Sequence, residues 1–144
     1  MCESIVDRHC LCCGRDGSFW LYVASEAGFA DIGFCTRDVN TSGAVWMAHQ
    51  PGKAWVYRLT GLFADSWVLH GRGPSEQGRK YGAPYQAGDI VTAWQNHTHL
   101  EFKVNGVSQG VVVPAKPLPA GVVGCAGVCS GGALSTHGCA NRSA

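Results

Sequence analysis

The chain has 144 residues, of which 46% are hydrophobic and 15% charged, with a formal net charge of +1. This length suits one domain, and this composition supports a packed core and excludes an intrinsically disordered chain. The sequence has no lysine and arginine cluster of the kind that binds nucleic acid, and no apolar run of about 20 residues that could span a membrane.

Eight cysteines are many for a chain of this length. Residues 1–8 include acidic side chains and no apolar stretch, so they do not have the pattern of a signal peptide. We therefore expect an intracellular, cytoplasmic protein whose cysteines are free thiols in a reducing compartment.

The first half of the chain contains short runs of aromatic and β-branched residues, separated by polar turns that contain glycine. Such runs are typical of β-strands. Residues 1–16 are polar and rich in cysteine, and we expect them to form an arm that precedes the domain. Strands are predicted at 19–23, 32–35, 44–47, 55–59 and 67–70.

The segment 81–113 is the most informative part of the sequence. An apolar run, Ile90–Trp94, is followed at 100–104 by apolar residues that alternate with charged ones, the pattern of a strand with one buried face. Asn105-Gly106 separates this strand from the next one, which includes Val111–Val113. This dipeptide predicts a tight hairpin turn, because both of its positions require a positive φ. The segment is therefore predicted to be a three-stranded antiparallel meander.

The rest of the second half adds a long loop and one more apolar stretch. Residues 71–88 lack periodicity, and loops longer than about 12 residues in a compact domain are usually functional or mobile. Residues 122–128 are small and apolar, and 136–144 are expected to form a polar tail. No amphipathic helix pattern is visible. The sequence predicts an all-β fold, a sandwich or barrel, whose domain spans 17–135.

These motifs resemble, in order and spacing, those of the SPRY domain, the core of the B30.2 module. The most specific part is the piece from Gly88 to Gly110. The similar positions are Phe19–Val23, Ile32-Gly33-Phe34, Ser66-Trp67-Val68 with Gly71, Tyr81-Gly82, Gly88-Asp89-Ile90-Val91, Leu100–Gly106 and Gly110.

The resemblance implies a bent β-sandwich of two antiparallel sheets, with a jelly-roll shape related to concanavalin-like lectins. It also implies recognition of a protein partner through variable loops at one end, without catalysis and without a cofactor. Residues 1–16 are too few for a complete RING domain, which needs about eight zinc ligands. We therefore expect a stand-alone adaptor or a small subunit of a larger multi-subunit complex.

Loop arginines and tyrosines, and tryptophans at strand ends, are the best candidates for partner binding, since these side chains dominate the hot spots of protein interfaces. For any one of them, an ordinary position in a solvated loop or in the core is the alternative. The candidate partner-binding residues are Arg37, Asp38, Trp46, His70, Arg72, Arg79, Tyr81, Tyr85 and Trp94.

Two other functions stay open at this point. One is a carbohydrate-binding, lectin-like sandwich, which rests on shape alone. The other is a zinc-stabilised structural protein, although the sequence lacks a C-x2-C knuckle and therefore favours no metal. No recognisable nucleophile motif surrounds any cysteine, so we do not expect an enzyme. The zinc ligands would come from His9, Cys10, Cys12, Cys125, Cys129 and Cys139.

Overall fold

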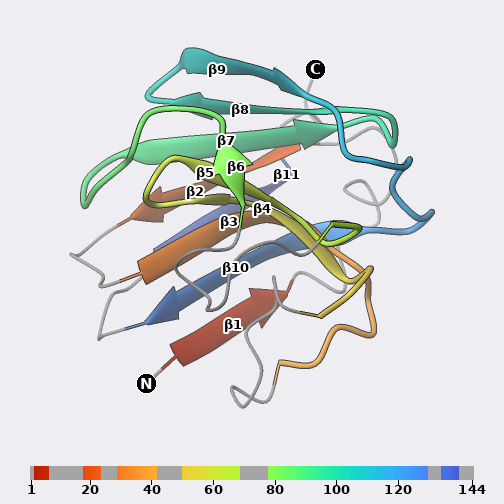
Figure 1. The fold of residues 1–144 in the computed structure, drawn as a ribbon. Helices are drawn as coiled ribbons and strands as arrows, with labels where there is room; N and C mark the ends of the chain where they lie inside the picture. Colours follow the sequence, from red (N-terminus) through yellow and green to blue (C-terminus); the bar gives the residue numbers. More distant parts are fainter. Residues whose placement is uncertain are drawn as a thin grey trace.

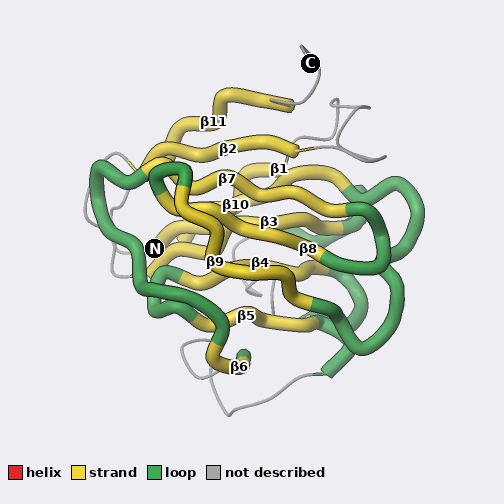
Figure 2. The backbone as a smooth tube through the Cα atoms, turned by 90° about the horizontal axis from the view of Figure 1, so that it is seen from above, coloured by secondary structure: helices red, strands yellow, loops and turns green. Residues whose placement is uncertain are grey.

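A computed structural model of the chain describes residues 2–6, 18–23, 29–41, 50–68, 78–129 and 134–139. These residues form two β-sheets and contain no helix (Figures 1 and 2). The six-stranded sheet has the order β1 (Cys2–Val6), β10 (Val123–Cys129), β3 (Phe29–Cys35), β4 (Ala54–Arg58), β5 (Leu62–Asp65) and β6 (Arg79–Lys80). The five-stranded sheet has the order β11 (Leu134–Cys139), β2 (Ser18–Val23), β7 (Ile90–Gln95), β8 (Leu100–Val104) and β9 (Val107–Val112).

Every neighbouring pair of strands in the two sheets is antiparallel. The sheets pack face to face, and the main core lies between them. Its largest fully buried side chains include Phe34 and Trp55 from the six-stranded sheet and Leu100 and Phe102 from the five-stranded one. The predicted all-β, two-sheet antiparallel sandwich is therefore confirmed.

The predicted meander is confirmed as β7–β8–β9, with the Asn105-Gly106 turn between the last two strands. Both turn residues have positive φ, 51° for Asn105 and 83° for Gly106, as the hairpin turn requires. Val91 and Ala93 of β7 and Phe102 of β8 face the core, so the residues between them face away from the sandwich.

The six-stranded sheet is buried on both of its faces around β3 and β4. All five residues of β4 are buried. Trp55 and Tyr57 belong to the core between the sheets, whereas Ala54 and Val56 belong to a second cluster on the other face. Gly33 lets β3 approach β4 closely, because a Cβ at this position would lie 2.1 Å from the Trp55 carbonyl oxygen.

A buried ion pair joins β3 to β4 on that second face. Arg58 donates from Nε to Oδ1 of Asp31 at 2.9 Å and from Nη2 to Oδ2 at 3.2 Å. The two residues are partners in the strand register. Both side chains are almost fully buried, 0% exposed for Arg58 and 1% for Asp31. The geometry is the bidentate one that makes arginine suited to a buried carboxylate.

The strand predicted at 67–70 is wrong in its described part. The strand in this region is β5, Leu62–Asp65, and Trp67 and Val68 lie in the turn that follows it. Two bonds form this turn: the Trp67 amide donates to Asp65 Oδ1 and the Val68 amide donates to the Asp65 carbonyl. Polar groups that close a turn in this way cannot also join a sheet ladder.

The two ends of the chain contribute strands to the sandwich. Residues 2–6, expected in an arm, form β1, which pairs with β10. Residues 134–139, which overlap the expected tail, form β11, which pairs with β2. The predicted strand at 44–47 lies outside the described residues, and the domain boundaries stay a prediction.

Candidate functional site

One end of the sandwich, on the right in Figure 1, holds the β7–β8 and β9–β10 connections and the described residues 36–41, 50–53 and 66–68 that flank β3, β4 and β5; we call it the loop-rich end. Hydrogen bonds between their described parts show that these connections are neighbours. The Leu118 amide donates to the His97 carbonyl, and the Gly52 amide donates to the Ser66 carbonyl. The end of the sandwich is therefore a connected surface.

Asp65, the last residue of β5, fixes this end. Its carboxylate accepts hydrogen bonds from the Trp55 indole at 3.2 Å, from the Trp67 amide at 3.0 Å and from the Ala115 amide at 2.8 Å. One buried side chain thus ties β4, the turn after β5 and the β9–β10 connection together. Lys116 lies over the Trp67 ring, with its ammonium 5.1 Å from the ring centre.

The β3–β4 connection has a hydrogen-bonded base. The Asn40 amide donates to the Gln50 side-chain oxygen at 2.8 Å, and the Gln50 side-chain nitrogen donates back to the Asn40 carbonyl at 2.7 Å. Asp38 accepts from Lys53 at 2.8 Å and from Thr36 at 2.7 Å. These two hydrogen bonds, that from Lys53 first, hold the pKa of Asp38 below its usual value.

Arg37 and Asp38 are exposed at the loop-rich end, where partner binding was expected. Arg79 is exposed on β6, donates to the Val113 carbonyl at 2.7 Å and lies over the Phe63 ring. The structure does not test their role in binding, which stays a prediction.

Residues 81–85, which we call the strap, lie along the β4–β5 turn: the Tyr81 and Gly82 amides donate to the Gly61 carbonyl, and the Tyr85 amide donates to the Leu59 carbonyl. The Tyr81 hydroxyl accepts from the Phe102 amide at 3.1 Å and donates to the Gly110 carbonyl. These two backbone groups lie where the β8–β9 register shifts. The tyrosine hydroxyl therefore supplies the hydrogen bonds that the ladder itself lacks there.

Tyr85, at the other end of the strap, is 2% exposed and belongs to the core. Its hydroxyl donates to backbone carbonyls, that of Tyr57 at 2.8 Å and that of Ala30 at 3.3 Å. Burial raises its pKa well above the ordinary value of a tyrosine. The Tyr85 side chain is not accessible to a partner in this structure, and the roles of Tyr81 and Tyr85 in partner binding stay predictions.

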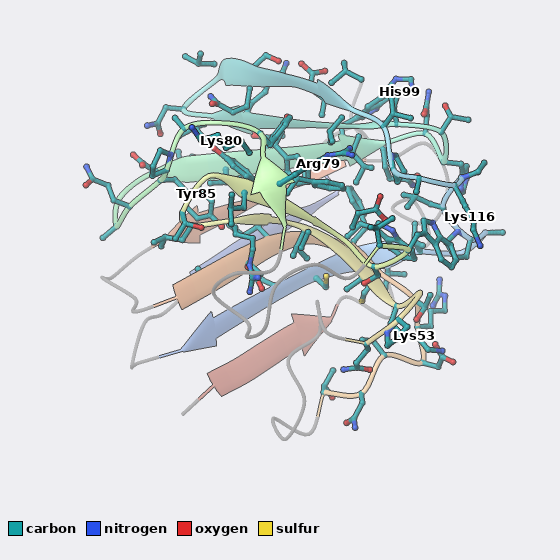
Figure 3. All side chains as sticks on the ribbon, in the orientation of Figure 1. Lys53, Arg79, Lys80, Tyr85, His99 and Lys116 are labelled. Carbon is teal, nitrogen blue, oxygen red and sulfur yellow. The ribbon has the colours of Figure 1, made fainter. Side chains whose placement is uncertain are left out.

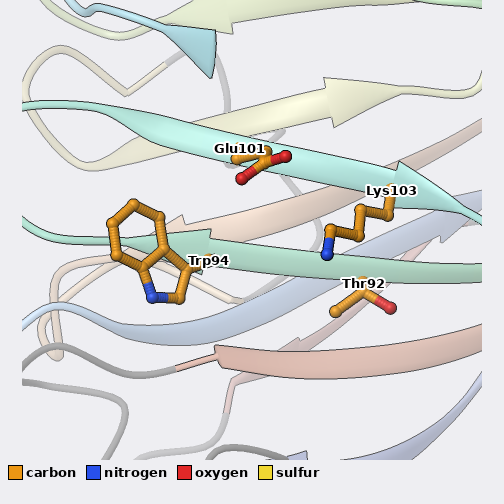
Figure 4. A pocket seen from close by; sticks show the side chains of 4 residues that line it. All are labelled: Thr92, Trp94, Glu101 and Lys103. Atoms are coloured by element: carbon orange, nitrogen blue, oxygen red, sulfur yellow. The ribbon is translucent and has the colours of Figure 1, made fainter. Parts of the chain in front are cut away.

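The outer face of β7 and β8 holds a pocket of about 300 Å³, lined by Thr92, Trp94, Glu101 and Lys103 (Figure 4). The strand register places Trp94 opposite Glu101 and Thr92 opposite Lys103. The four side chains thus form two adjacent cross-strand pairs on one face of the sheet. The Trp94 ring also packs against the His99 ring, with the ring centres 5.3 Å apart.

An exposed hydrophobic residue adjoins this pocket. Val111 of β9 is opposite Glu101 in the register and is 59% exposed. Because Trp94 is the penultimate residue of β7 and His99 lies in the β7–β8 connection, the pocket opens next to the loop-rich end. We call Thr92, Trp94, Glu101, Lys103 and Val111 the β7–β9 face.

Of the residues predicted from the sequence, Trp94 is the one that lies in this pocket. Thr92 and Lys103 were missed, although alternation along 100–104 already placed Glu101 and Lys103 on one side of their strand. Trp46, His70 and Arg72 lie outside the described residues. Figure 3 labels Arg79 beside β6, His99 near the β7–β8 connection and Lys53 in the β3–β4 connection.

Of the six suggested zinc ligands, Cys125 is the one whose side chain the structure describes, so the zinc site stays a prediction. Cys125 is buried, and burial together with its contact to the Cys35 thiol raises the pKa of Cys125 well above its usual range. Cys129 and Cys139 lie in β10 and β11, in different sheets. No group of three potential ligands occurs among the described side chains, and His9, Cys10 and Cys12 are not among them.

Comparison with solved structures finds the same fold. A crystal structure of a human SPRY domain matches with a TM-score of 0.61 at 16% identity, covering 94% of this chain and 84% of that one. The chain has the SPRY fold. The SPRY domain of human HERC1 matches with a TM-score of 0.59 at 14% identity, covering 92% of this chain and 76% of that one. No family model and no curated protein matches the sequence.

A SPRY fold at this level of identity does not by itself assign a function, which has to be argued from the site. The described part of the chain offers no helix with the length and apolar character needed to cross a bilayer.

Proposed function

We propose that this SPRY-like chain is a non-catalytic protein-interaction module, and that its partner binds at the β7–β9 face where this face meets the loop-rich end. The observation that carries the proposal is the pocket beside Trp94, with exposed Val111 next to it. An accessible tryptophan beside an exposed aliphatic side chain, with polar groups around them, has the composition of an interface hot spot.

The scaffold beneath this face supports the proposal, because a rigid site loses little entropy when a partner binds. Val91, Ala93 and Phe102 are fully buried behind the pocket, and Tyr81 closes the gap in the β8–β9 ladder. The likeness to SPRY domains, which generally act as protein-interaction modules, agrees with this role. Whether the chain works as an adaptor or as a subunit of a larger assembly depends on the partner.

Affinity capture from native extract with matched variants tests the proposal. Val111→Asp and Val107→Asp form a matched pair, because both valines lie on β9 and are 59% and 64% exposed. Val107 pairs with Val104, which packs against the core, so Val107 lies on the other side of the sheet. We expect a specific partner to be retained by wild type and Val107→Asp, and lost with Val111→Asp and with Trp94→Ala.

A hot-spot tryptophan contributes about 2 kcal/mol or more, so Trp94→Ala should weaken the purified complex at least about 30-fold. Thermal unfolding of each variant controls for misfolding. Retention of every partner by Trp94→Ala and Val111→Asp would refute the proposal. Specific retention of a glycan on an array, with loss through Trp94→Ala, would favour the lectin-like alternative instead.

A further inference from the structure

The β7–β9 face has an uneven charge arrangement that indicates what the partner presents to it. Glu101 and Lys103 are two residues apart on the same side of β8. Yet the ion pairs within the described part of the chain are Lys53–Asp38 and Arg58–Asp31, and Glu101 and Lys103 do not form one.

A hydrogen bond at the β8–β9 register shift holds one carboxylate oxygen of Glu101. The Ser108 hydroxyl donates to Glu101 Oε2 at 2.5 Å, and Ser108 Oγ accepts from the Gly110 amide at 3.1 Å. Both bonds lie at the irregular part of the ladder, between Glu101 and Lys103. The carboxylate is therefore held toward β9 by a serine that is itself fixed by the backbone.

Lys103 is consequently left with an unneutralised ammonium at the pocket. Among the described residues it has neither an ion-pair partner nor a hydrogen-bond acceptor. Figure 4 shows its side chain extending over β7, between Trp94 and Thr92. The pocket thus combines an ammonium, a hydroxyl and an indole wall, whereas its carboxylate is already hydrogen-bonded.

Resting on the proposed function, we infer that the pocket takes an acidic side chain of the partner protein. Its carboxylate accepts hydrogen bonds from the Lys103 ammonium and the Thr92 hydroxyl. The Trp94–Glu101 pair lies two residues along the strands from the Thr92–Lys103 pair, a spacing of roughly 6.6 Å. An extended partner segment repeats its side chains at the same interval, so an apolar residue two positions from the acidic one packs on Trp94.

A second acidic residue of the partner is excluded from the part of the face around Glu101. Glu101 stands between Trp94 and Val111 in the register, so a partner carboxylate placed there meets a like charge. The partner segment therefore has the pattern acidic–x–apolar, with a single acidic side chain in contact with this face.

Capped heptapeptides of the pattern acidic–x–apolar, and the same peptides with glutamine in place of glutamate, provide the probe. Binding to the full chain is followed by the NMR shift of the Trp94 indole N–H. We expect the glutamate peptides to bind about tenfold more tightly than the glutamine peptides, as for a charge-assisted hydrogen bond. This difference should disappear in Lys103→Met, and 0.5 M salt should reduce it.

Equal binding of the two peptide series to wild type, or shifts confined to other parts of the chain, would overturn the inference. Tighter binding of phosphoserine peptides than of glutamate peptides would overturn the carboxylate assignment. Lys80→Met is the matched control, because Lys80 is also an exposed lysine but lies on β6. If the captured partner is lost with Trp94→Ala but retained by Lys103→Glu, this inference alone is refuted. If the partner binds Trp94→Ala as well as it binds wild type, the proposed function is refuted.

Discussion

The buried Asp31–Arg58 pair should behave as a unit whose halves are costly to remove singly. Arg58→Met removes both arginine hydrogen bonds from the buried Asp31 carboxylate, and Asp31→Leu removes both carboxylate acceptors from the buried guanidinium. Removing one partner of such a pair costs about 3–5 kcal/mol. The free energy of unfolding of a domain is typically about 5–15 kcal/mol, so each single variant should be severely destabilised.

The double variant Asp31→Leu/Arg58→Met should regain most of this loss, because it leaves no unpaired charge in the apolar cluster. Urea unfolding monitored by tryptophan fluorescence measures all four proteins and gives the coupling between the two sites. Lys53→Met, at the exposed pair with Asp38, is the control and should change the midpoint little. Single variants no less stable than this control, or a double variant at the sum of the singles, would refute the reasoning.

Three further predictions concern the scaffold. Tyr81→Phe leaves the Phe102 amide without its acceptor, so it should cost about 1–3 kcal/mol and speed hydrogen exchange at that amide; unchanged exchange would contradict this role. Burial raises the pKa of Tyr57 to about 12, so the unfolded state loses its phenolic proton first as the pH rises above 10. The ionisation of Tyr57 alone should then lower the free energy of unfolding by about 1.4 kcal/mol per pH unit up to pH 12, and this share of the slope should be absent in Tyr57→Phe. Gly33→Ala places a Cβ against the Trp55 backbone and should abolish soluble expression or lower the melting temperature sharply; a wild-type melting curve would show that the strands can separate.

The sequence predicts the five-stranded sheet better than the six-stranded one, and the reason is burial. One face of β8 is toward the core and the other toward solvent, so its residues alternate visibly. In β4 every residue is buried, and in β5 Phe63 and Ala64 belong to clusters on opposite faces. Strands covered on both sides have no alternation to read. This is why β5 was missed and the neighbouring turn at Trp67 was taken for a strand.

The candidate site shows a second limit of the sequence. Tyr81 and Tyr85 lie in an irregular segment, a pattern that favours a recognition loop. Their hydroxyls, however, form hydrogen bonds with backbone groups that are far away in the sequence. Such pairings depend on how the sheets pack, and no local pattern encodes them. Trp94 could be suggested because it ends a strand, whereas the unpaired state of Lys103 depends on the bonds made by Ser108.

Side-chain footprinting of the purified complex tests the central claim most directly. Hydroxyl radicals label exposed aromatic side chains, and an amine reagent labels exposed lysines, each with and without the captured partner. We predict that the partner protects Trp94, His99 and Lys103, while Lys80 on β6 reacts at an unchanged rate. Unchanged labelling of Trp94 and Lys103, with protection confined to Lys80 or other residues outside the β7–β9 face, would contradict the account.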